Sequence, residues 1–154
     1  MKDPELPIRK VEISALIHAT EDRKKVEKAI SAILSANLSS IINTRNLCGH
    51  YGNPIKLMTI LVKSRENLDD FLEGLMIKLR SIDKETLLKE LPLHVAEKDT
   101  FYLRLNKQAA ARGVISLGEE DPIRIKIKFR RISKKNNLIH GLERMLKNCG
   151  NTSI

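Results

Sequence analysis

Basic side chains alternate with apolar side chains over residues 123–131, which read IRIKIKFRR. In an extended strand this pattern places an apolar row in the core and a row of cations on the outer face. Neighbouring cations in that row lie about 7 Å apart, a spacing comparable to that of phosphates along one nucleic-acid strand. The segment therefore predicts a surface that binds a polyanion. Its cations are Arg124, Lys126, Lys128 and Arg130, and Arg131 and Lys134 extend the row.

Two ordinary explanations compete with binding: a solvated outer face, and lysines that protect an edge strand from aggregation. The charge of the chain favours binding, because 28 basic residues stand against 19 acidic ones, for a formal net charge of +9. Nine basic residues and only one acidic residue lie between positions 122 and 147. Such clustered charge favours a polyanionic partner, either nucleic acid or an anionic membrane face.

A second alternating segment, residues 101–106, would place Tyr102 and Arg104 on the outer side of a strand. A phenol ring and a guanidinium group can each stack on an unpaired base. Aromatic residues make up only 3% of the chain, and tryptophan is absent. We therefore expect recognition of a nucleic-acid backbone with weak sequence preference.

The segment CGHYGNP, residues 48–54, concentrates reactive and conformationally special residues. Its two glycines, asparagine and proline predict a tight corner between two strands. Backbone N–H groups at such a corner are available to anions, so His50 and Tyr51 are candidates for hydrogen bonds to phosphate or sugar.

The segment KQAAARG, residues 107–113, predicts one or two helical turns closed by a glycine. Lys107, Gln108 and Arg112 surround three alanines, which would allow the backbone of a partner to approach closely. A helix that packs through its alanines explains the segment equally well.

The sequence offers little for catalysis or metal binding. Asp69 and Asp70 are adjacent on a predicted helix, so their side chains diverge by about 100°. The acids at 119–121 fall in a predicted hairpin turn, where they would be ordinary solvated residues. Cys48 and His50 form only a pair of ligand types, and the four histidines lack zinc-binding spacings. We expect no enzyme activity, no metal and no cofactor.

The elements that would position these residues follow from hydrophobic periodicity. Strands are predicted over residues 9–18, 40–47, 54–63 and 100–106, and a hairpin over 114–131 with its turn at 118–122. Helices are predicted after the cap Thr20, after the cap Ser64, from Asp83 to Pro92, and over 136–148. This mixed order predicts a single α+β domain with a mixed or antiparallel sheet, helices on one face and the other face partly open.

The predicted limits are an N-terminal arm at 1–9, the domain at 10–148 and a frayed tail at 149–154. The N-terminus lacks the basic start and apolar core of a signal peptide, so we expect a cytoplasmic protein. Apolar runs are all shorter than the roughly 18 residues of a membrane span, and the cysteines at 48 and 149 predict no disulfide. The sequence leaves a homodimer open.

Three stretches together resemble an archaeal family of small RNA-binding proteins described as predicted exosome subunits. They are EISALIHATEDRKKV at 12–26, CGHYGNPI at 48–55 and LRLNKQAAARG at 103–113. The resemblance runs from about residue 10 to 147, and its motif covers 18–22, 49–54 and 107–110. The chain departs from the family pattern at Asn106, where we expect an acid, and at Ala111, where an aromatic is frequent.

The resemblance implies an α+β fold similar to that of the ribosomal protein that binds 5S rRNA, an archaeal cytoplasmic setting, and RNA binding without catalysis. We therefore expect a basic RNA-binding protein of RNA processing and degradation, associated with the exosome, or of ribosome biogenesis. The partners would be RNA and proteins of those assemblies, without a membrane. The alternative is a protein–protein adaptor of an RNA-processing complex, whose basic face meets an acidic protein surface.

Overall fold

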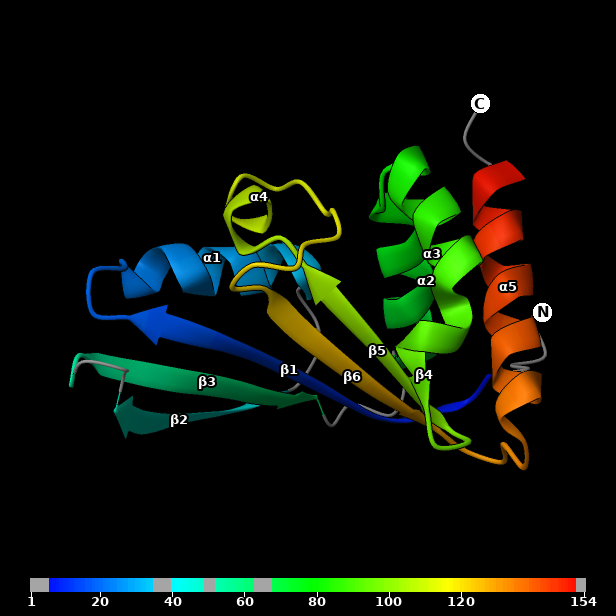
Figure 1. Ribbon diagram of the computed structural model, residues 1–154, viewed down its shortest axis with the longest axis horizontal. Coiled ribbons are helices and arrows are strands. Elements are labelled where there is room, and N and C mark those ends of the chain that lie inside the picture. Colours follow the sequence, from blue (N-terminus) through cyan, green and yellow to red (C-terminus); the bar gives the residue numbers. More distant parts are fainter. Residues whose placement is uncertain (1–5, 35–39, 49–51, 63–67, 152–154) are drawn as a thin grey trace.

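The computed structural model describes residues 6–34, 40–48, 52–62 and 68–151, and Figure 1 shows how its elements are arranged. His50, Tyr51 and the predicted cap Ser64 lie outside these residues. The elements are β1 (Ile8–His18), α1 (Arg23–Ile33), β2 (Ser40–Cys48), β3 (Pro54–Val62), α2 (Leu68–Lys78), α3 (Ser81–His94), β4 (Val95–Ala96), β5 (Thr100–Leu105), α4 (Lys107–Ala111), β6 (Ile123–Phe129) and α5 (Lys135–Asn151).

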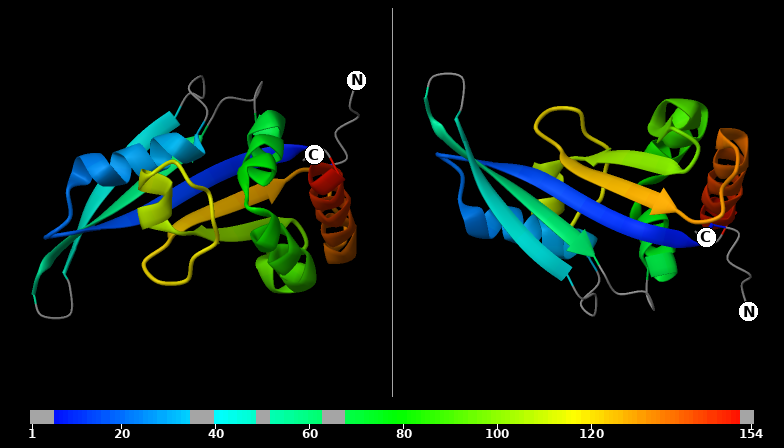
Figure 2. Two further views of the ribbon diagram at one scale, coloured as in Figure 1. Left: turned by 90° about the horizontal axis from the view of Figure 1, so that it is seen from above. Right: turned by 90° about the horizontal axis from the view of Figure 1, so that it is seen from below.

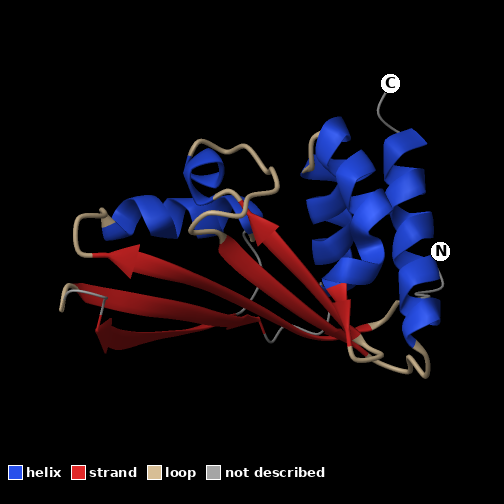
Figure 3. Cartoon of the chain, in the orientation of Figure 1, coloured by secondary structure: helices blue, strands red, loops and turns tan. Residues whose placement is uncertain are grey.

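The six strands form one antiparallel sheet in the order β2-β3-β1-β6-β5-β4. β1 lies between β3 and β6 and pairs with both along most of its length. Helices and strands occupy separate layers, as Figure 3 shows. The predicted α+β class with an antiparallel sheet is confirmed.

All the described helices lie on one side of the sheet, and the strands are in front of them when the molecule is seen from below (Figure 2). α1 and α4 lie over one half, and α2, α3 and α5 pack together at the other end. The predicted alternation of β1 is confirmed, because Val11, Ile13, Ala15 and Ile17 are buried beneath the helices. The apolar residues of β6 are buried on the same side.

The predicted hairpin over residues 114–131 is wrong in its first half. Only β6 forms as a strand, whereas residues 114–117 contribute a single bridge between Leu105 and Leu117. Asn106 N–H donates to Ser116 C=O at 2.8 Å, and Gly118 N–H donates to Arg104 C=O at 3.0 Å. The segment therefore lies along β5, because the short β4 covers only residues 100 and 101 of that edge.

Several helix ends differ from the sequence-based expectation. Asp22, and not Thr20, caps α1 by accepting from Lys24 N–H. α3 continues through Pro92 to His94, although proline lacks the backbone N–H that would donate to the preceding turn. β1 begins at Ile8 and α5 ends at Asn151. A buried Cys149 lies within that last turn of α5.

Gly118 allows the close approach of the 114–118 segment to β5, and its replacement tests that arrangement. A Cβ there would lie 2.8 Å from Asn106 Cα and 2.9 Å from its backbone nitrogen. We expect Gly118→Ala to lower the free energy of unfolding by about 1–3 kcal/mol in urea denaturation, through overpacking against backbone.

Gly74→Ala is the matched control, because a Cβ at this position in α2 meets no atom within 4 Å. It should raise the free energy of unfolding by about 0.5–1 kcal/mol through helix propensity. Equal effects of the two variants would contradict the close contact at Gly118.

Candidate nucleic-acid interface

The open face of the sheet gathers cations from three neighbouring strands, because paired residues of an antiparallel sheet project on the same side. Arg104 of β5 pairs with Arg124 of β6, and Tyr102 pairs with Lys126. Across the other edge of β6, Lys128 pairs with Lys10 of β1. We call the five cations the basic strip: Lys10, Arg104, Arg124, Lys126 and Lys128.

The members of the basic strip are all exposed or half-exposed. Their positions lie about 5 Å apart across strands and about 7 Å apart along a strand. Lys10 was not among the candidates from the sequence, because only the pairing of β1 with β6 brings it beside Lys128. The alternation in the sequence predicted that Lys10 lies on the polar side of β1, but it did not predict that Lys128 is its neighbour.

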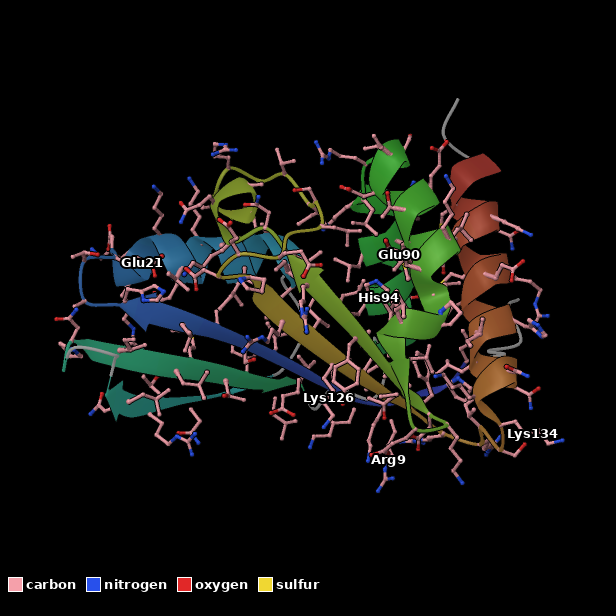
Figure 4. The ribbon with its side chains drawn as sticks, in the orientation of Figure 1. Arg9, Glu21, Glu90, His94, Lys126 and Lys134 are labelled. Carbon is pink, nitrogen blue, oxygen red and sulfur yellow. The ribbon has the colours of Figure 1, made fainter. Side chains whose placement is uncertain are left out.

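Tyr102 lies within the basic strip and is 39% exposed. Lys126 Nζ lies 6.0 Å from the centroid of its ring, at the limit of a cation–π contact. On the other side of the strand, His94 Nδ1 of α3 lies 2.9 Å from the carbonyl oxygen of Tyr102. Figure 4 shows His94 on α3 and Lys126 lower, towards the open face. α3 thus fixes the backbone that presents the ring.

Three further predicted cations follow the end of β6. Arg130, Arg131 and Lys134 are exposed, and Arg131 has a φ of +59°, so the chain turns away from the strand here. Arg130 therefore does not continue the regular row of β6. Figure 4 places Lys134 and Arg9 near this end of the sheet, where these cations can lengthen the basic strip.

The predicted contacts on residues 107–112 lie elsewhere. Gln108 and Arg112 are exposed, but α4 lies on the helix-covered side of the sheet (Figure 1), so the structure does not bring them together with the basic strip. Asn106 caps α4 by accepting from Ala109 N–H at 2.9 Å. Asparagine and aspartate cap helices about equally well, which explains why the departure from the family pattern is tolerated here.

The prediction that Lys107 contacts a ligand on the surface is corrected by its position, because the side chain is only 3% exposed. Its ammonium group donates to Leu16 C=O at 3.0 Å and to Glu21 Oε1 at 2.8 Å, and it pairs with Asp121 Oδ2. Three acceptors match the three N–H donors of a lysine. Lys107 is therefore a structural residue that joins α4 to β1, to the start of α1 and to the loop before β6.

Asp121 was predicted to be an ordinary solvated turn residue, and this interpretation is wrong. Besides Lys107, it contacts His18, whose Nε2 lies 3.1 Å from Asp121 Oδ1. Its backbone has a φ of +44°. No local pattern distinguishes Asp121 from its neighbouring acids, so the sequence carried no signal for this role.

His18, Glu21 and Asp121 form a group whose ligand-type atoms all lie within 4.8 Å of one another. Such a group could in principle attract a metal ion. The Lys107 ammonium, however, already contacts both carboxylates and balances part of their charge. The chemistry of this site is thus that of a buried lysine with its counter-ions.

Removal of the Lys107 ammonium tests this assignment. Lys107→Met should lower the free energy of unfolding by about 3 kcal/mol, because Glu21 and Asp121 would face each other without a cation. Lys25→Met, on the exposed side of α1, should change it by less than about 0.5 kcal/mol. Thermal and urea denaturation of both variants measure the difference, and equal stability would contradict the structural role of Lys107.

Within the part of the chain that the structure describes, none of the helices is both long enough and apolar enough to span a lipid bilayer.

Comparisons with known proteins identify the family. The model of a family described as RNA binding matches residues 10–129. An RNA-binding protein of Pyrococcus abyssi is 32% identical over 141 residues, which cover 87% of this chain and 90% of that protein. A DUF54-family structure from Archaeoglobus fulgidus has a TM-score of 0.77 at 30% identity, covering 90% and 99% of the two chains. A DUF54-family structure from Sulfolobus solfataricus has a TM-score of 0.73 at 26% identity, covering 95% and 100%. These matches confirm the resemblance seen in the sequence, and the chain belongs to the RNA-binding family.

Proposed function

We propose that this protein binds RNA without catalysing a reaction, and that the basic strip holds the RNA backbone. The observation that carries the proposal is the gathering of five accessible cations on a face of the sheet that no described helix covers. Membership in a family described as RNA binding supports RNA as the polyanion. Binding through phosphates would release condensed counterions and give a steep dependence on salt.

Further residues complete the proposed interface. Arg130, Arg131 and Lys134 extend the positive charge beyond the end of β6, and Tyr102 offers a ring on which a base can stack. His50 and Tyr51 lie outside the described residues and stay proposed contacts from the sequence. Gln108 and Arg112, on the helix-covered side, would contact only an RNA that wraps around the sheet.

An open sheet face on which Tyr102 is exposed suits single-stranded RNA. Side chains cannot read the deep, narrow major groove of an RNA helix, whereas unpaired bases can be splayed out onto a protein surface. The cations of the basic strip lie in two dimensions, so they can follow one phosphate chain along β6 and across to β5 or β1.

The same proposal includes a cellular setting. The relatives are archaeal proteins. The resemblance seen in the sequence supports a role in RNA processing and degradation, in association with the exosome, or in ribosome biogenesis. A cytoplasmic location and a single domain over residues 10–148 belong to this proposal. Association with RNA that co-purifies from an archaeal extract would test it.

A protein adaptor is the second candidate function, because α3 exposes large apolar side chains. Ile82 is 64% exposed and Leu93 is 84% exposed, and both lie away from the basic strip. Such side chains are more typical of protein contacts than of RNA contacts. Capture of protein partners that persists after ribonuclease treatment, and is lost in Leu93→Ser, would favour this function.

Charge reversal in the basic strip tests RNA binding directly. Replacing Arg124, Lys126 and Lys128 with glutamate should lower the affinity for single-stranded RNA on the order of 100-fold at low salt. The slope of log affinity against log salt should fall by about 0.7 for each phosphate contact that is lost. Fluorescence anisotropy at several salt concentrations, with single-stranded RNA, double-stranded RNA and DNA, measures both quantities.

The matched control is the reversal of Lys24, Lys25 and Lys28, which are exposed on α1 on the opposite side of the sheet. This variant has the same net charge as the strip variant, so a non-specific charge effect would weaken both equally. If the two triple variants bind RNA alike, the basic strip is not the interface. Circular dichroism confirms that both variants remain folded.

A further inference from the structure

A pocket of about 280 Å³ opens on the open face beside the basic strip. It lies between the last part of β1, the start of β3 and the loop that precedes β6. Leu16, Leu57 and Pro122 give it apolar walls, and Arg124 reaches it from the basic strip. Its volume lies just below the range for ligand sites, about 300–1,000 Å³, so it suits one planar ring system and not an extended ligand.

Two carboxylates, from Glu119 and Asp121, stand at this pocket. They would repel a phosphate, so the part of an RNA that enters must be neutral, which leaves the ribose and the base. The apolar walls favour the base over the ribose, because the faces of a base are apolar whereas a ribose carries hydroxyl groups. The phosphates of the same nucleotide can remain on Arg124 and the neighbouring cations of the basic strip.

The two carboxylates differ in their availability. Both oxygens of Asp121 are already engaged, one by Lys107 and the other by His18 at 3.1 Å. Glu119 has one ion pair, from its Oε2 to Arg104 Nη1 at 3.2 Å, and its side chain is 82% exposed. An exposed pair of this kind is weak and can reorganise when a ligand arrives. Glu119 is therefore the acceptor that the pocket offers to a ligand.

A carboxylate discriminates among the four bases because it only accepts hydrogen bonds. On its Watson–Crick edge, guanine presents two adjacent donors, N1–H and the N2 amino group, which match the two oxygens of one carboxylate. Adenine and cytosine place an acceptor nitrogen beside their amino group, and uracil flanks its single donor with two carbonyl oxygens. Each of these three bases would therefore place a hydrogen-bond acceptor against a carboxylate oxygen, and the two would repel each other.

We propose that this pocket binds a single unpaired guanine base of the RNA, and that Glu119 determines the specificity by accepting from guanine N1–H and N2–H. The base is held between the apolar walls, and Arg104 orients the Glu119 carboxylate from the basic strip. The inference rests on the proposed RNA binding and adds to it a base preference, which the low aromatic content of the chain did not predict.

The experiment compares short oligouridines that carry one central guanine, adenine or cytosine, or none, by fluorescence anisotropy. The wild-type protein should bind the guanine oligomer about tenfold more tightly than the others, the discrimination typical of a bidentate contact. Glu119→Gln should reduce this preference to near parity. Glu120→Gln, which removes the same charge from an exposed neighbour that does not line the pocket, should keep it.

A second measurement does not depend on binding of the polymer. The methyl groups of Leu16 and Leu57 should shift in NMR spectra on addition of guanosine monophosphate, and much less with the other three monophosphates. The shifts should be absent in Glu119→Gln.

The outcomes separate this inference from the proposed function. Salt-dependent RNA binding without a guanine preference would overturn the assignment of the pocket as a guanine site and leave the basic strip as the RNA site. If guanosine monophosphate shifts the methyl signals but the protein binds no oligomer, the guanine site in the pocket is supported. The role of the basic strip in RNA binding is then overturned. An equal loss of preference in Glu119→Gln and Glu120→Gln would show an effect of net charge alone and overturn the role of Glu119.

Discussion

A buried ammonium group is the constraint on which this end of the molecule depends. Taking a lysine out of water is costly unless its charge and all its donors are matched. Lys107 meets that requirement with the carbonyl of Leu16 and the carboxylates of Glu21 and Asp121. These partners come from the end of β1, the entry to α1 and the loop before β6. The ammonium thereby ties α4 to a strand carbonyl 91 residues earlier in the chain.

The same interaction shapes the open face. Because Lys107 holds Asp121, the 118–122 loop stays beside the outer side of β1, where it forms one wall of the pocket. Gly118 brings this loop against β5, and Arg104 then reaches Glu119. A buried structural lysine and a surface of basic residues are in this way parts of one arrangement, although only the surface residues are exposed to solvent.

The two faces of the sheet differ in which side chains they carry and in whether helices cover them. The inner face carries only apolar side chains at its centre, and the helices bury them, so the outer side chains are not part of the core. The outer face can therefore hold like charges on neighbouring strands, such as Lys10 beside Lys128, without a helix to cover them. Repulsion among these cations is tolerable in water, and a polyanion would relieve it.

Local patterns in the chain were sufficient to predict which side chains face the core and which face solvent. The alternation in β1, β5 and β6 assigned Val11, Tyr102 and Arg124 to the correct sides, because consecutive residues of a strand must point to opposite faces whatever their neighbours are. The α+β class followed from the same patterns.

The contacts between distant segments could not be read in this way. A lysine that will be buried has the same local sequence signature as one on the surface, so Lys107 looked like an RNA contact. Asp121 looked like a solvated turn residue, and residues 114–117 looked like a strand of a hairpin. The positions of all three depend on which segments meet in space, and that is set by packing and charge compensation over the whole fold.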